Sequence, residues 1–154
     1  MIHFKIATPE RIILETDVDS VTLPTELGEI TILPNHVPLV SNLAAGEIMY
    51  KAGGKQEFFA VSGGVIEVKS AEGGPASGGK DISEVIVLAD TAELGHEIDI
   101  KRAEEARDAA KKLMEEKTVT GPAAIDAAAQ FGKNLARIKV AHRHRTRKAP
   151  HVES

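Results

Sequence analysis

The spacing of apolar residues changes near Asp90. Before it, apolar and polar residues alternate in short runs that end at glycine or proline, as Ile30 and Ile32 do before Pro34. Alternation buries one face of a strand, and many short strands with frequent turns are typical of an antiparallel sandwich or barrel. After Asp90, alanine and charged residues recur at helical spacing. The pattern predicts a two-domain α+β chain: an antiparallel β-sandwich over residues 1–90, an antiparallel α-helical hairpin over residues 91–148 and a tail over residues 149–154.

Two alanine-rich stripes are expected to pack against each other in the hairpin. Asp99 is placed to cap the first helix, and Gly121-Pro122 separates it from the second. The first stripe holds Ala103, Ala106, Ala110 and Leu113, and the second holds Ile125, Ala128, Ala129, Gly132, Leu135 and Ala136.

Packing between such stripes should be weak, because each buried CH₂ contributes only about 0.8 kcal/mol and alanine carries few carbons. Alanine, glutamate, lysine and arginine are nevertheless good helix formers, so the helices should persist individually. The composition is compatible with a hairpin that opens as a switch, and equally with an ordinary helical appendage. Within the sandwich, residues 72–81 are rich in Gly, Pro, Ser and Ala, which predicts a long hairpin loop.

The balance of charged residues also changes near Asp90. Residues 1–90 hold 6 basic and 13 acidic residues, whereas residues 91–154 hold 13 and 10, which gives the net charge of −4. Residues 133–148 contain seven basic residues and no acid. Clustered lysine and arginine can neutralise nucleic-acid phosphates, so a stand-alone nucleic-acid or scaffold-binding module is the alternative function. No aromatic residue interleaves the run, which favours a charged helix end with no nucleic-acid partner.

Composition and motifs point away from catalysis. The chain has no cysteine, which removes disulfides, thiolate metal sites and cysteine nucleophiles. It has neither a phosphate-binding loop nor a Gly-x-Ser-x-Gly elbow, and its histidines lack zinc-protease spacing. We therefore expect a protein that is not an enzyme, with no catalytic residue and no metal site. Since no apolar run approaches about 18 residues, any membrane association should go through a partner protein.

Four sequence blocks, taken together, are specific. They are GEITILPNHVPL from Gly28, FAVSGGVIEV from Phe59, VLADTAE from Val87 and IDIKRA from Ile98. In this order and spacing, over about residues 1–141, the chain resembles the epsilon subunit of the F-type ATP synthase.

The resemblance implies a non-catalytic rotor subunit of the central stalk in a proton-translocating complex. Such a subunit couples rotation of the membrane ring to ATP synthesis in the catalytic head, and its C-terminal helices inhibit ATP hydrolysis. The implied partners are the gamma subunit, the c subunits of the rotor ring and, in an extended state of the hairpin, the catalytic beta subunits. The implied location is peripheral, on the cytoplasmic face of the bacterial inner membrane.

The resemblance also assigns contact residues. Glu29 and His36 are candidates for contact with the rotor ring, although turn chemistry between Pro34 and Pro38 gives them a structural role as well. Contact with acidic segments of the catalytic head falls to basic residues of the second helix, namely Arg137, Lys139, Arg143 and Arg145.

Some bacterial members of the family bind a regulatory ATP in the folded hairpin, although no cofactor is required. The corresponding residues here are Glu93, Asp99, Arg102, Lys133 and Arg137. Lys133 stands where an arginine is expected, and lysine lacks the planar fork that fixes a phosphate. A helix cap at Asp99 and an intrahelical charge pair with Arg102 are the alternative roles.

Overall fold

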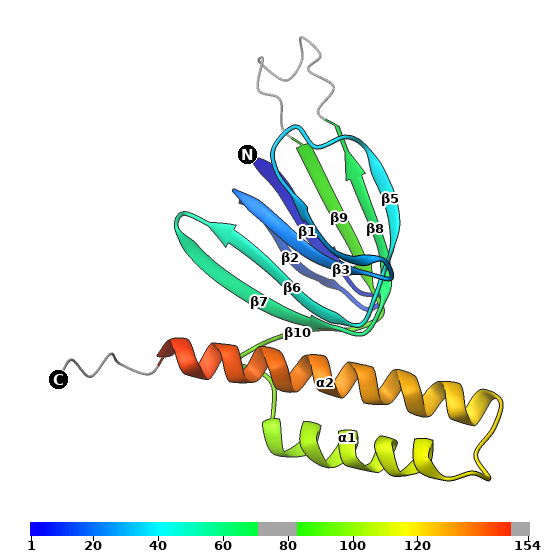
Figure 1. Cartoon of the computed structure of the whole chain (residues 1–154). Helices are drawn as coiled ribbons and strands as arrows, with labels where there is room; N and C mark the ends of the chain where they lie inside the picture. The colour runs from blue at the N-terminus through cyan, green and yellow to red at the C-terminus, as the bar shows by residue number, and fades with distance from the viewer. Residues whose placement is uncertain (71–82, 149–154) are drawn as a thin grey trace.

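The structure is a computed structural model that describes residues 1–70 and 83–148. The predicted 72–81 loop and the 149–154 tail therefore lie outside the described residues. Figure 1 shows a curved sheet packed against one of two antiparallel helices. This arrangement confirms the α+β class, with a β-sandwich followed by a helical hairpin.

Ten strands form one sheet within the described residues, in the order β10-β7-β6-β3-β5-β8-β9-β1-β2, with β4 paired to β3. All the pairs are antiparallel except β1 with β9, which run parallel. The strands are β1 (Ile2–Ala7), β2 (Ile12–Val18), β3 (Ser20–Thr25), β4 (Gly28–Ile32), β5 (Leu39–Leu43), β6 (Gly46–Ala52), β7 (Lys55–Val61), β8 (Gly64–Lys69), β9 (Ser83–Ala89) and β10 (Ala92–Leu94).

The core of the sandwich follows the predicted alternation. In β9, Val85 and Val87 are fully buried while Leu88 faces outward. Buried aliphatic residues from β1, β3, β6, β8 and β9 meet in one cluster around the rings of Phe4 and Phe59. The inner face of the curved sheet covers this cluster. The outer face of the sheet can contact other elements.

Both helices begin where the sequence predicts. α1 (Ile100–Glu115) is capped by Asp99, whose Oδ1 accepts a hydrogen bond of 3.1 Å from the backbone N–H of Arg102. α2 (Pro122–Lys148) follows Gly121, whose φ of 64° ends the preceding turn. In the described part of the chain, neither helix is long and apolar enough to cross a membrane.

The second predicted stripe is wrong, because α2 packs on two faces rather than one. Ile125 is 73% exposed and Leu135 is 43% exposed. One face of α2 lies on α1 and another on the sandwich, so no single stripe describes its burial (Figure 1). The residues buried on α2 are Ala127, Asn134, Ala136, Ile138, Val140 and Ala141.

The contact between the two helices is loosely filled. On α1, Ala103 and Ala110 are buried as predicted, but Leu113 is largely exposed. A cavity of about 420 Å³ remains between α1 and α2, and alanines form much of its wall. Because alanine offers few carbons for packing, this alanine-lined contact agrees with the predicted weak packing inside the hairpin.

Candidate functional site: the contact between α2 and the sandwich

The second half of α2 lies across β6 and β7 (Figure 1). A small apolar cluster forms the centre of this contact. Phe58 and Ala60 of β7 meet Val140 and Ala141 of α2 there. Apolar burial holds the hairpin against the sandwich here, but over few large side chains.

The first of two ion pairs beside this cluster joins Glu47 of β6 to Arg143 of α2. Arg143 Nη1 lies 2.7 Å from Glu47 Oε1, and the guanidinium carbon lies 5.5 Å from the centre of the Phe58 ring. The Glu47 side chain is only 5% exposed, whereas Arg143 is 47% exposed. Burial raises the pKa of the Glu47 carboxyl, and the positive charges of Arg143 and Lys139 only partly oppose that rise.

The second ion pair joins β10 to α2. Arg137 Nε donates a hydrogen bond of 2.7 Å to Glu93 Oε2, and Arg137 Nη1 donates one of 3.1 Å to Asn134 Oδ1. The buried Asn134 side chain in turn donates 2.8 Å to the backbone oxygen of Gln130. The guanidinium of Arg137 is thus held from both sides.

β10 and Gly95 determine how closely α2 can approach the sandwich. β10 pairs with β7, so the sheet continues beyond Asp90 to Leu94. A Cβ built on Gly95 would lie 3.0 Å from His144 Cβ and 3.1 Å from Val140 Cγ1. Even a methyl group at this position would require the neighbouring atoms of α2 to shift by a few tenths of an ångström, so glycine permits the close approach.

Two pairs form among the five residues predicted to hold ATP, and Lys133 belongs to neither pair. Glu93 and Arg137 pair with each other, while Asp99 caps α1 at the backbone of Arg102. Lys133 is half-buried on α2. ATP binding by these residues stays a prediction, and a phosphate that reached Arg137 would compete with Glu93.

Of the four residues predicted to contact the catalytic head, two are engaged by the sandwich. Arg137 and Arg143 bind Glu93 and Glu47. Lys139 lines a cavity of about 520 Å³ beside Glu47, and Arg145 is exposed.

Glu29 and His36 lie at opposite ends of β4. Glu29 follows the β3–β4 turn, pairs with Pro24 and lines the same cavity as Lys139. His36 belongs to the β4–β5 loop, which lies beside the start of β9, where the backbone N–H of Asn35 donates a hydrogen bond of 3.0 Å to Ser83 Oγ. Its Nδ1–H donates 2.7 Å to the backbone oxygen of Val37. The structure does not bring the two candidates for ring contact together.

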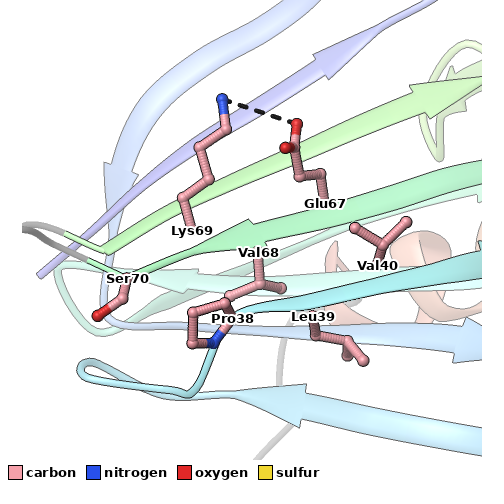
Figure 2. A pocket seen from close by; sticks show the side chains of 7 residues that line it. All are labelled: Pro38, Leu39, Val40, Glu67, Val68, Lys69 and Ser70. Carbon is pink, nitrogen blue, oxygen red and sulfur yellow. Dashed lines mark ion pairs between the residues drawn. The ribbon is translucent and has the colours of Figure 1, made fainter.

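A groove lies at the same end of the sandwich as His36. Its volume is about 580 Å³, and Val40, Glu67 and Lys69 are among the residues that line it (Figure 2). Lys69 Nζ lies 3.6 Å from Glu67 and 3.4 Å from Glu84, while Val40 is 71% exposed. Sequence patterns alone did not indicate this groove.

Sequence reasoning also missed Glu47, Phe58 and Gly95 as parts of the helix contact. In the sequence, nothing distinguishes Glu47 from other polar residues of a strand, or Gly95 from other glycines of a loop. Their roles depend on where α2 comes to lie, which no local pattern encodes. The one available signal was the surplus of acid in residues 1–90 and of base in residues 91–154, which predicts attraction between the two halves.

Comparison with known proteins agrees with this architecture. The family description "ATP synthase, Delta/Epsilon chain, beta-sandwich domain" matches residues 1–72, and "ATP synthase, Delta/Epsilon chain, long alpha-helix domain" matches residues 96–142. An ATP synthase epsilon chain of Dehalococcoides mccartyi is 40% identical over 140 residues, which is 91% of either chain. One from Chloroflexus aggregans is 38% identical over 147 residues, or 96% of either chain.

Solved structures show the same fold at lower identity. A chain of the Euglena gracilis mitochondrial ATP synthase superposes with a TM-score of 0.72 at 22% identity. The superposition covers 92% of the present chain and 81% of the other. With both domain descriptions and most of the length matched, the chain belongs to the delta/epsilon family of ATP synthase chains, as an epsilon subunit of the F-type enzyme.

Proposed function

We propose that this epsilon subunit is a non-catalytic part of the central stalk. In this proposal the sandwich turns with the gamma subunit and the c ring, and so couples rotation to ATP synthesis in the head. The hairpin restrains ATP hydrolysis when it leaves the sandwich and reaches the beta subunits. The complex places the chain on the cytoplasmic face of the membrane.

One observation carries the inhibitory part of the proposal. Arg137 and Arg143, two of the cations expected to meet acidic segments of the head, are bound by Glu93 and Glu47 of the sandwich. In the described conformation both guanidinium groups are therefore paired with carboxylates of the sandwich. A hairpin that left the sandwich would release both guanidinium groups together, so one movement would turn the contact with the head on or off.

The packing of α2 supports such a movement. Its contact with the sandwich is a small apolar cluster, and its contact with α1 leaves a cavity of about 420 Å³. Exposed apolar side chains, among them Ile125 and Leu135, are available on α2 for a new partner. The helices can therefore move without exposing the core of the sandwich.

The outer surface of the sandwich supports the docking part. Val65 and Leu88 are paired neighbours on β8 and β9, and both are exposed. These two side chains form a small apolar contact that suits the gamma subunit, since exposed apolar patches mark interaction sites. The far end, with His36 and the groove of Figure 2, suits the polar loops of the ring.

The direct test compares the full chain with a chain that ends at Glu97. This end point keeps β10, which pairs with β7. We expect the purified catalytic complex to hydrolyse ATP several-fold more slowly with the full chain, because only the full chain carries α1 and α2. Binding of both chains to the gamma subunit is the control. Equal hydrolysis rates at equal occupancy would remove the inhibitory role and leave the docking role.

A further inference from the structure

We infer that Glu47 opposes docking of the hairpin, and that a proton taken up by Glu47 relieves this opposition. The inference rests on the opening of the hairpin that the proposed function requires. It assigns to the interface a proton-linked control that makes the docked state more stable in acid and less stable at neutral pH.

The position of Glu47 provides the first reason. Its side chain lies at the start of β6, opposite Ala60, and α2 covers it so that 5% remains exposed. Oε1 meets Arg143, but Oε2 is buried and has no hydrogen-bond partner among the described residues. An ionised carboxylate in this position loses the hydration of Oε2 and forms no hydrogen bond in its place. A protonated carboxyl carries no net charge and loses much less.

The surrounding charges provide the second reason. From α2, Arg143 and Lys139 face Glu47 and favour the ionised form, while Glu29 from β4 disfavours it. Because about half of the Arg143 side chain is exposed, solvent screens its attraction. Burial outweighs the attraction, and the pKa of Glu47 is raised above its ordinary value of 4.5.

The sign of the effect follows from linkage. When the hairpin leaves, Glu47 becomes exposed and its pKa returns toward the ordinary value. The docked state therefore binds the proton more tightly than the open state does, so acid favours docking. The stabilisation is complete below 4.5 and is lost as the pH rises through the raised pKa of the docked state. Above that pKa, Glu47 is ionised in both the docked and the open state, and the proton no longer stabilises the docked state.

Hydrogen exchange on the isolated full chain tests the inference. A helix that has left the sandwich loses its tertiary support and unfolds locally more often. Protection of the α2 amides around Val140 and Ala141, corrected for intrinsic exchange rates, therefore follows the opening equilibrium between pH 4.5 and 7.5. Amides of β9 serve as the internal reference for unfolding of the sandwich. We expect α2 to be several-fold better protected at the acid end than at the neutral end in the wild-type chain.

Two variants give opposite expected results. In Glu47→Gln the dependence on pH should flatten, and protection at neutral pH should rise to the acid level of the wild type. In Arg143→Gln the dependence should grow, because the carboxylate loses its main partner. Glu57→Gln, which removes an exposed carboxylate from β7, is the matched control and should behave as the wild type. His96 and His144 are present in every chain, so differences between the chains isolate Glu47.

Lower α2 protection in Glu47→Gln at neutral pH would overturn the inference, because Glu47 would then hold the hairpin down. An unchanged pH profile in that variant would overturn it as well. The exchange experiment uses no ATP and no other subunit. A failure here is therefore distinct from a failure of the hydrolysis comparison, which tests the proposed function.

Discussion

Replacing Gly64 with valine is expected to destabilise the sandwich severely. Gly64 has a φ of +140°, and a Cβ built on it would lie 2.0 Å from the backbone oxygen of Leu88 in β9. The neighbouring atom is backbone in a paired strand, so it cannot move aside without breaking the β8–β9 ladder. We expect a loss above about 4 kcal/mol, against a total stability of about 5–15 kcal/mol for a domain. Denaturant unfolding and co-purification with the gamma subunit measure the effect.

Gly54→Val is the matched control for this prediction. Gly54 also has a positive φ, of +78°, but nothing lies within 4 Å of a Cβ built there. Only backbone strain of about 1–3 kcal/mol is expected. If the two variants lost equal stability, the close contact with β9 would not be the reason for glycine at position 64.

Replacing Gly95 with valine is expected to release α2 while leaving the sandwich folded. The new side chain would collide with Val140 and His144, which lie 3.1 and 3.0 Å from the position of its Cβ. Because α2 is held by few large apolar residues, we expect it to leave rather than to deform the sheet. Protection of the α2 amides from exchange should fall by at least about tenfold, which corresponds to 1.4 kcal/mol, while that of β9 should not change.

A graded series controls this second prediction. Gly95→Ala adds only the Cβ and should lie between the wild type and the valine variant. If a released hairpin inhibits the catalytic complex, as proposed, ATP hydrolysis should be fastest with the wild-type chain, slower with Gly95→Ala and slowest with Gly95→Val. Release of α2 without slower hydrolysis would show that an undocked hairpin is not sufficient for inhibition.

The parts of the fold that local chemistry determines could be predicted from the sequence. Alternating residues such as Val85 and Val87 identified strands, since a half-buried strand repeats every two residues. Asp99 and Gly121 marked the helix start and the hairpin turn, because caps and positive φ values restrict residue type locally.

The features that depend on tertiary position could not be predicted in this way. The stripe assigned to α2 failed, because the helix touches both α1 and the sandwich and periodicity describes one buried face only. Glu47 and Gly95 gained their roles from the approach of α2. Glu29 lies near the start of the five-residue strand β4, and His36 lies in the loop that follows its end, although the two residues are close in sequence.

The central claim is that the docked hairpin permits ATP hydrolysis and the released hairpin restrains it. A disulfide can hold the docked state, because a Cβ built on Gly132 of α2 would lie 3.8 Å from the Cβ of Ala45 in the sandwich. This separation is typical of natural disulfides. The chain has no cysteine of its own, so Ala45→Cys with Gly132→Cys creates a single pair.

The deciding measurement is the ATP hydrolysis rate of the complex assembled with this double variant, before and after reduction. Each single-cysteine variant controls for the effect of the reductant. The oxidised complex should hydrolyse ATP as fast as one with the chain that ends at Glu97, and reduction should slow it to the rate of the wild-type complex. Equal rates before and after reduction, with the disulfide shown to form and to open, would contradict the account.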